Sequence, residues 1–277
     1  FLDPLDTSSP WGNYGDTQAE MAKLLVTIRT KFPRQKIVAN RGMFLIDKHS
    51  QEYNRSVDGV LFESMYTIWD WARGAGILSP WCRGDYYCFR DQLAPAATKS
   101  GYSVFFVNYI NPQQSDFANY LRNSSDLIAG RGLEYVADPG LQKLFPRFED
   151  LTPPASSTVP QLGALSVLEL GNGRFRLSFD ISGMGQRQLG KDFFLDIRLS
   201  KESLPAMEPC LVNPIPFDYS SVQQVEAGEG KLHCSIESFG LDKATNYWVY
   251  LRGFEKGRGP SASPYLNVSL KTADAQA

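Results

Sequence analysis

Three acidic residues stand at the ends of short apolar runs, where paired carboxylates could act on one substrate. Asp3 and Asp6 belong to the run at the start of the chain, and Glu63 ends a second run about sixty residues later. Parallel strands that end at one cleft would bring such side chains together. Cleavage of a glycosidic bond requires two carboxylates across a cleft, one to donate a proton and one to attack or stabilise the sugar cation.

Polar residues also end neighbouring apolar runs. Arg41 could orient an acid through a bidentate pair, and Asn40 could hold a substrate hydroxyl. Tyr109 could hydrogen-bond the attacking carboxylate, and Asp6 could hold a hydroxyl or cap the turn after its strand. Simpler alternatives stay open: an arginine–carboxylate pair that only braces the rim of the sheet, and a tyrosine hydroxyl exposed above the core.

An aromatic segment follows Glu63. It contains Trp69 and Trp71, and flat aromatic faces of this kind are surfaces on which sugar rings stack. The alternative is a small core beneath a long loop. The segment therefore offers candidate substrate-binding residues whose role the sequence leaves open.

Residues 1–150 alternate continuous apolar runs with amphipathic stretches. The sequence Thr17-Gln18-Ala19-Glu20 predicts a capping box that opens a helix, and Pro33 ends that helix. Continuous apolar strands joined by helices indicate a parallel sheet covered on both faces, so we expect an α/β domain. The expected later strands lie within residues 36–42, 57–64, 101–109 and 132–138.

The pattern changes after residue 150. Residues 151–163 are rich in Pro, Ser and Thr, which predicts an exposed, semi-rigid linker. From residue 164 to 273 apolar and polar residues alternate in short runs separated by turn residues, as in an antiparallel β-sandwich. We expect three parts, at 1–150, 151–163 and 164–273.

Composition restricts the partners. A formal net charge of -2 gives no basic field for nucleic acid or an anionic membrane surface. No apolar run is long enough to span a bilayer. Glycine-rich phosphate loops are missing, and the two histidines, His49 and His233, suggest neither a metal site nor a Ser-His-Asp apparatus. We therefore expect no cofactor and no metal.

The cysteines carry information on compartment. Cys82 and Cys88 lie six residues apart, and Cys210 and Cys234 lie in the second half of the chain. Two pairs suit two disulfides in an exported protein, which predicts an extracellular, periplasmic or cell-surface location. Four reduced and mostly buried thiols are the alternative.

The ordered motifs resemble a known family. FLDPLDT, RTKFP, KIVANRG, DGVLFES, SGYSVFFVNY and GLEYVAD are together similar to the second part of the barrel of glycoside hydrolase family 114, which has an (α/β)8 fold and includes endo-α-1,4-polygalactosaminidases. The resemblance covers about residues 1–145. It implies the C-terminal portion of a (β/α)8 barrel, with its first three strands upstream of Phe1.

The resemblance also implies roles for individual residues. Asp3 falls on the acid of the fourth barrel strand, with Asp6 as its companion, and Glu63 falls on the acid of the sixth strand. We expect Asp3 to be the nucleophile or stabiliser and Glu63 the general acid/base, and the reverse assignment stays open. Three further residues occupy matching positions at strand ends: Asn40, Arg41 and Tyr109.

The second half resembles a fibronectin type III or related immunoglobulin-like module. Leu241 precedes Tyr247 by six residues, as at the tyrosine corner of such sandwiches. Two functions fit the whole chain: a glycosidase that acts on a polysaccharide, with an α-1,4-linked galactosamine polymer as one candidate, or a non-catalytic carbohydrate-binding or structural protein on a degenerate barrel. If three strands lie upstream, residues 1–277 alone leave open sheet edges, and we expect them to be poorly soluble or inactive.

Overall fold

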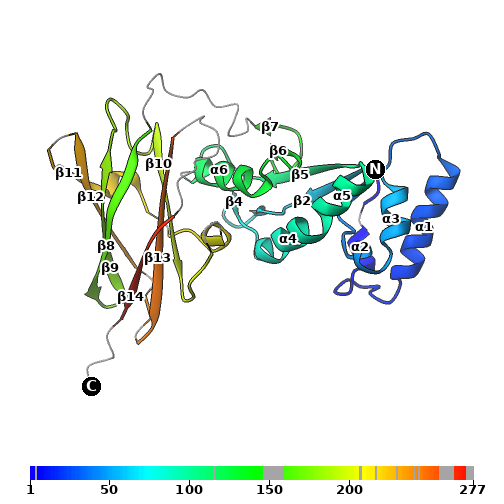
Figure 1. Ribbon diagram of the computed structural model, residues 1–277, viewed down its shortest axis with the longest axis horizontal. Coiled ribbons are helices and arrows are strands. Elements are labelled where there is room, and N and C mark those ends of the chain that lie inside the picture. Colours follow the sequence, from blue (N-terminus) through cyan, green and yellow to red (C-terminus); the bar gives the residue numbers. More distant parts are fainter. Residues whose placement is uncertain are drawn as a thin grey trace. The chain divides into compact units, whose positions relative to one another are not determined.

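The computed structural model divides the chain into two compact units (Figure 1). One comprises Phe1–Gln114 and Ser124–Phe145, and the other comprises Ser115–Asn123 and Pro146–Ala277. The structure describes residues 1–3, 5–114, 116–145, 159–205, 208–215, 217–228, 230–239, 241–242, 244–255 and 265–272. Most of the expected linker, residues 151–158, lies outside the described residues. Its last three residues are already strand, because β8 begins at Gln161.

A five-stranded sheet forms the centre of the first unit. Its order is β1-β2-β5-β6-β7, and the first four strands are parallel, while β7 is antiparallel to β6. Leu2 adds a parallel bridge to Ala39 beside β1. The parallel α/β arrangement that the continuous apolar runs predict is therefore present. The strands are β1 (Val38–Asn40), β2 (Gly59–Glu63), β5 (Ser103–Tyr109), β6 (Leu133–Ala137) and β7 (Leu144–Phe145).

Helices connect these strands and supply one side of a shared apolar core. Buried side chains of the strands, among them Val60, Phe62 and Phe106, pack with Leu25 and Leu93 from the helical segments. The helical segments are η1 (Leu5–Ser8), α1 (Gln18–Lys31), α2 (Phe44–Lys48), α3 (Ser50–Ser56), α4 (Cys82–Cys88), the π-helical turn η2 (Phe89–Leu93), α5 (Ala94–Ser100) and α6 (Phe117–Ile128). No helix among the described residues is both long and apolar enough to cross a membrane.

The first helix begins where the sequence predicts, but not through a capping box. Thr17 is the N-cap of α1, and its side chain makes no capping hydrogen bond. The Thr17 hydroxyl instead donates to the Tyr14 carbonyl at 2.7 Å. The predicted capping box is wrong because this hydroxyl is used by the preceding turn.

The aromatic segment after Glu63 is an ordered hairpin. Strands β3 (Thr67–Asp70) and β4 (Ala75–Leu78) pair in antiparallel register. Asn108, fully buried on β5, fixes the root of this hairpin: its Oδ1 accepts from the backbone N–H groups of Tyr66 and Thr67, each at 3.1 Å. Its Nδ2 donates to Ser124 Oγ and Glu134 Oε1 at 2.8 and 2.9 Å. All four hydrogen bonds are structural.

The disulfides expected from the sequence are not formed. Cys82, Cys88, Cys210 and Cys234 are all free thiols, and all but Cys88 are buried. Cys82 and Cys88 occupy the two ends of α4, and six residues of helix separate their Cα atoms by about 9 Å. That separation exceeds the roughly 7 Å limit for a disulfide.

The second unit is an antiparallel β-sandwich with one shared core. Its sheets have the orders β11-β12-β9-β8 and β10-β13-β14. Phe175 and Phe179 of the first sheet pack with Phe193, Leu195 and Val249 of the second. The segments are β8 (Gln161–Gly171), β9 (Arg174–Ser182), β10 (Phe193–Ser200), η4 (Glu208–Leu211), η5 (Tyr219–Ser221), β11 (Gln223–Glu226), β12 (Lys231–Phe239), β13 (Asn246–Glu255) and β14 (Leu266–Lys271).

The predicted tyrosine corner has its hydrogen bond. Tyr247, near the start of β13, is buried, and its hydroxyl accepts from the backbone N–H of Asp242 at 2.9 Å. Leu241, which is also buried, belongs to the same core. The contact ties the chain before β13 to the start of that strand.

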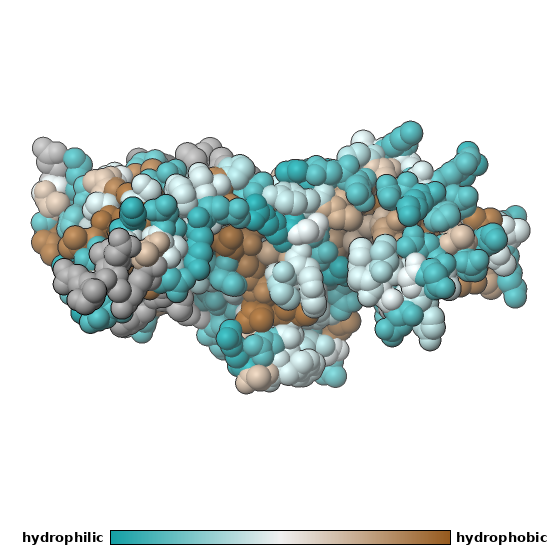
Figure 2. Space-filling view, turned by 90° about the horizontal axis from the view of Figure 1, so that it is seen from below, coloured by the Kyte–Doolittle hydropathy of each residue, from teal (hydrophilic) through white to brown (hydrophobic). Residues whose placement is uncertain are grey.

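Hydrophilic residues cover most of the visible surface, with apolar patches between them (Figure 2). Exposed apolar side chains of the first unit gather on β6, β7 and the turn between them, at Leu133, Leu141 and Leu144. Scattered exposed apolar residues are ordinary on protein surfaces. No role is assigned to this edge.

We predict that Asn108→Ala lowers the free energy of unfolding of the first unit by about 2–4 kcal/mol. The substitution removes the partners of two buried N–H groups and of the Ser124 and Glu134 side chains. Denaturant unfolding measures the change. Asn13→Ala, at an exposed position, is the matched control and should shift stability by less than about 0.5 kcal/mol. Equal effects of the two substitutions would contradict the anchoring role of Asn108.

Candidate active site

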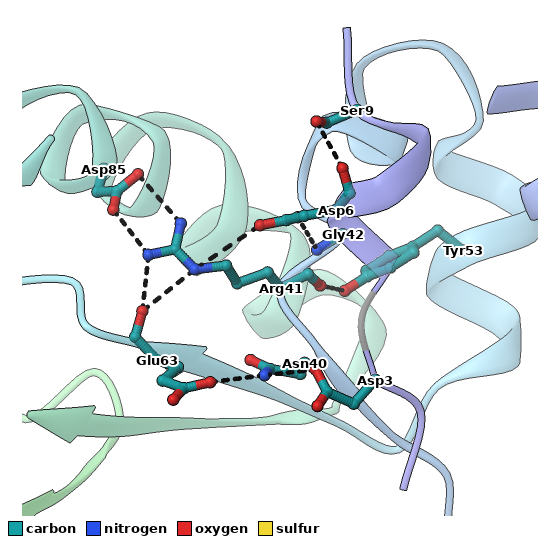
Figure 3. Close-up of polar contacts among 9 residues, drawn as sticks. All are labelled: Asp3, Asp6, Ser9, Asn40, Arg41, Gly42, Tyr53, Glu63 and Asp85. Atoms are coloured by element: carbon teal, nitrogen blue, oxygen red, sulfur yellow. Dashed lines mark hydrogen bonds and ion pairs between the residues drawn. The ribbon is translucent and has the colours of Figure 1, made fainter. Parts of the chain in front are cut away.

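One amide nitrogen joins two of the predicted acids. Asn40 Nδ2 donates to Asp3 Oδ1 at 2.9 Å and to Glu63 Oε2 at 2.8 Å (Figure 3). Each of its two hydrogens therefore serves one carboxylate. The sequence predicts that Asn40 holds a substrate hydroxyl, whereas the structure uses its amide to hold the acids side by side.

Neighbouring strand ends place these three residues. Leu2 exchanges backbone hydrogen bonds with β1, donating to Val38 O at 2.9 Å and accepting from Asn40 N at 2.8 Å. β1 pairs in turn with β2, with Asn40 opposite Leu61. Asp3, Asn40 and Glu63 thus stand at the carboxyl ends of adjacent parallel segments, the edge of such sheets where sites are built.

A third strand end completes the environment of Glu63. Tyr109, the last residue of β5, donates its hydroxyl hydrogen to Glu63 Oε1. Burial, followed by the hydrogen bond to Glu63 and the Glu63 charge, raises the pKa of Tyr109, so the phenol stays protonated and remains a donor. Both Glu63 oxygens therefore accept a hydrogen bond, from Tyr109 and from Asn40.

Asp3 is less enclosed. Its residue is exposed, and within the described part of the chain its side chain hydrogen-bonds only to Asn40, through Oδ1. Oδ2 has no hydrogen-bond donor among the described residues. Glu63 thus accepts hydrogen bonds at both carboxylate oxygens, whereas Asp3 accepts one at Oδ1 alone.

Arg41 contacts the backbone of Glu63 rather than its carboxylate. Its Nη2 and Nε donate to the Glu63 carbonyl at 2.7 and 3.1 Å, and Nη2 also donates to Asp85 Oδ2 at 3.0 Å. The guanidinium lies over the Phe62 ring, 5.0 Å from its centroid. Arg41 does orient an acid-bearing residue, as its place after the strand predicts, but through the main chain.

The chain must turn sharply for Arg41 to do this. Arg41 has a positive φ of 58°, which costs energy for a non-glycine residue, and Gly42 follows at 77°. The Tyr53 hydroxyl stabilises the turn by donating to the Arg41 carbonyl at 2.8 Å. An added Cβ at Gly42 would lie 2.8 Å from Leu5 Cδ1, so only glycine fits beside Arg41.

Asp6 belongs to this turn and is not brought to Asn40. Its Oδ1 accepts from Gly42 N at 3.2 Å, and its Oδ2 lies 3.8 Å from Arg41 Nε. Burial raises the pKa of Asp6, while the Arg41 charge and the Gly42 hydrogen bond oppose the rise. These contacts correspond to the turn-capping alternative for Asp6.

Asp85 is a site residue that the sequence does not single out. It lies in α4, twenty-two residues after Glu63, and it is largely buried against Arg41. Asp85 does not follow a strand in the sequence, because it belongs to helix α4, which brings it to Arg41. The only sequence signal is an acid directly before two tyrosines, Tyr86 and Tyr87.

The two predicted tryptophans lie on the β3–β4 hairpin. Trp69 is half-buried, and Trp71 is 78% exposed. Their rings meet edge to face, with centroids 6.4 Å apart. Neither makes a hydrogen bond or ring contact to Asp3 or Glu63.

The Asp3 and Glu63 side chains have no cation beside them among the described residues. Over the described ranges no ion pair reaches either carboxylate, since the nearby Arg41 pairs with Asp6 and Asp85. No group of three or more His, Cys, Asp or Glu side chains in those ranges could hold a metal ion. Two carboxylates, one amide and one phenol make an arrangement suited to proton transfer and to stabilisation of a positive charge.

We predict that the stability of Asp85→Asn, relative to that of the unsubstituted protein, increases as the pH rises above the ordinary carboxyl pKa of 3.8. Burial raises the pKa of Asp85 above its ordinary 3.8, so the folded protein binds a proton more tightly there than the unfolded chain does. Stability therefore falls as the pH rises above this value. Asparagine stays neutral at every pH and keeps an oxygen for Arg41.

Thermal unfolding across the pH range measures this difference. The melting temperature of Asp85→Asn minus that of the unsubstituted protein should become more positive with pH. Asp16→Asn, at an exposed position away from Arg41, is the control and should show no such trend. A difference that stays constant or declines with pH would contradict the account of Asp85.

Comparison with known proteins shows a distant structural likeness. No family model matches the chain, and no curated protein matches it. The chain is similar to the structure of the glycoside hydrolase domain of PelA from Pseudomonas aeruginosa, with 23% sequence identity and a TM-score of 0.39. The likeness covers 52% of this chain and 54% of that one, so the chain spans about half the length of that structure.

Proposed function

We propose that this protein is a glycoside hydrolase that acts on a polysaccharide. The observation that carries the proposal is the single Asn40 nitrogen shared by Asp3 and Glu63. It holds two carboxylates together at the edge of a parallel sheet, as cleavage of a glycosidic bond requires.

We assign Asp3 as nucleophile and Glu63 as general acid/base. With this assignment the Tyr109 hydroxyl contacts the acid/base, and not the attacking carboxylate that the sequence suggests as its partner. Attack on the sugar carbon needs an oxygen with a free lone pair, and Asp3 Oδ2 is the oxygen of the pair without a hydrogen-bond donor among the described residues. Glu63 has the hydroxyl of Tyr109 and the amide of Asn40 beside its two oxygens. As general acid, Glu63 enters the first step protonated and gives that proton to the leaving-group oxygen while Asp3 forms the bond to the sugar carbon. The resulting Glu63 carboxylate then takes a proton from the water that cleaves the bond between the sugar and Asp3.

The spacing favours net retention of configuration. Asp3 Oδ1 and Glu63 Oε2 hydrogen-bond to one nitrogen at 2.9 and 2.8 Å. The distance between these two facing oxygens cannot exceed the two lengths placed end to end, which is shorter than the roughly 6.5 Å that separates the carboxyl groups of the closest inverting pairs.

The charge of the site favours a cationic or neutral sugar. Asp3 and Glu63 have no compensating cation among the described residues, so an anionic polymer would be repelled and an amine attracted. An α-1,4-linked galactosamine polymer, the substrate class that the family resemblance implies, has the required amines. We propose it as the substrate.

The proposal extends to the frame and the setting of the enzyme. The segment at Leu2 and strands β1, β2, β5 and β6 would be strands four to eight of a (β/α)8 barrel. The partition of the sandwich into β11-β12-β9-β8 and β10-β13-β14 corresponds to the ABED and CFG sheets of immunoglobulin-like modules, related to the fibronectin type III fold. We propose it as an accessory module of an enzyme that works outside the cytoplasm on an extracellular polymer.

We predict that Asp3→Asn and Glu63→Gln, made in the intact protein, each lower kcat on α-1,4-linked galactosamine oligomers by at least about a hundredfold. Each change removes a titratable oxygen while keeping the shape of the side chain. Asp16→Asn and Glu20→Gln, at exposed positions, are the matched controls and should leave kcat unchanged.

Release of reducing ends measures the rate, and circular dichroism verifies folding. Unchanged turnover in both site variants would contradict the assignment of Asp3 and Glu63 as catalytic residues. Oligomer binding with no turnover by the unsubstituted protein would favour the carbohydrate-binding alternative.

A further inference from the structure

A cavity of about 340 Å³ lies among the segments that follow strands β2, β5 and β6. Its wall includes Trp69 from the β3–β4 hairpin, Ile110, Asn111 and Gln113 after β5, and Asp138 and Lys143 after β6. All three segments follow carboxyl ends of strands of the parallel sheet. The cavity therefore opens at the edge of the sheet that carries Asp3 and Glu63.

Tyr109 connects the cavity to the acids. Its hydroxyl donates to Glu63, and the next residue, Ile110, lines the cavity. Burial and the Glu63 contact raise the pKa of Tyr109, and the Asp138 charge adds to that rise, so Asp138 lies within electrostatic range of the phenol. A polymer bound at the acids could extend directly into this cavity.

Trp69 is held in place by the backbone around it. Trp69 pairs with Gly76 across the hairpin. The Gln114 side chain donates to Gly76 O and accepts from Gly76 N, each at 3.0 Å. Gly76 also packs against β5 so closely that an added Cβ would lie 2.1 Å from Tyr109 O.

These contacts fix the backbone that carries Trp69, and the Trp71 ring packs edge to face against its indole. An aromatic ring that is ordered before binding loses little conformational entropy when a ligand stacks on it. The hairpin root is fixed as well, through Asn108. The cavity therefore has the character of a preformed ligand site.

The chemistry of the lining fits a sugar ring. Trp69 offers a flat apolar face, while Gln113 and Asp138 offer an amide and a carboxylate to hydroxyls or an amine. Backbone contacts hold the remaining polar groups: the Asn111 amide contacts Gly74 O and Gln113 N, and Asp138 Oδ1 accepts from Lys143 N. The volume lies at the lower end for ligand sites, which suits a small ring better than an extended chain. We propose that this cavity binds one sugar unit of the substrate polymer next to the cleaved bond, with Trp69 as its stacking surface.

This inference rests on the proposed function, and a binding measurement separates the two. Glu63→Gln serves as the parent because the proposed function predicts that it binds without hydrolysis. Calorimetry with a hexamer of α-1,4-linked galactosamine then compares this parent with Glu63→Gln carrying Trp69→Ala, Trp69→Phe or Trp248→Ala. Trp248 lies half-buried on β13 of the second unit and is the matched control.

We expect Trp69→Ala to raise the Kd of the hexamer by about tenfold, since the stacking face is lost. Trp69→Phe keeps a flat ring and should retain most of the affinity, and Trp248→Ala should match the parent. Melting temperatures of the variants verify that each is folded.

Equal affinity of Trp69→Ala and the parent, or no measurable affinity in either, overturns the inference. Hydrolysis of the hexamer by the unsubstituted protein is measured alongside. If hydrolysis is present, the proposed function survives those results. If neither binding nor hydrolysis is found, the proposed function fails together with the inference.

Discussion

The arrangement of the site depends on the two hydrogen bonds donated by Asn40 Nδ2. They hold Asp3 and Glu63 within reach of one bond in a substrate, and they exist only because three adjacent backbone segments end at the same level. This arrangement costs free energy, because the amide oxygen of Asn40, Oδ1, is buried and has no hydrogen-bond partner among the described residues. A buried unsatisfied acceptor costs about 1–3 kcal/mol, and proteins retain such groups mainly where a site requires them.

Around this centre the neighbouring contacts fix the backbone more than the side chains. Arg41 binds the Glu63 carbonyl, adopts a left-handed conformation to do so, and is neutralised by Asp6 and Asp85. The carboxylate of Glu63 is left for Asn40 and Tyr109. The positive charge of Arg41 is therefore used for positioning, and it is not paired with the carboxyl group of Asp3 or Glu63.

The sequence predicts the parts of this site that depend on strand periodicity. Asp3, Asn40, Glu63 and Tyr109 all end apolar runs, and parallel pairing of those runs brings them together. The hydrogen-bond and ion-pair partners of these side chains cannot be predicted from the sequence in the same way, because they depend on distances across the fold. For that reason the sequence suggests a substrate hydroxyl for Asn40, pairs Cys82 with Cys88, and passes over Asp85, which only α4 brings to Arg41.

The central claim, a nucleophilic Asp3 held beside Glu63 by one amide, is tested most directly by trapping the covalent intermediate. The intact protein is treated with 5-fluoro-α-D-galactosaminyl fluoride, which should form the glycosyl-enzyme faster than it breaks down, and the adduct is located by peptide mass spectrometry. The account predicts a single sugar on the peptide that contains Asp3. A sugar on Glu63, or turnover with inverted product and no adduct, would contradict it.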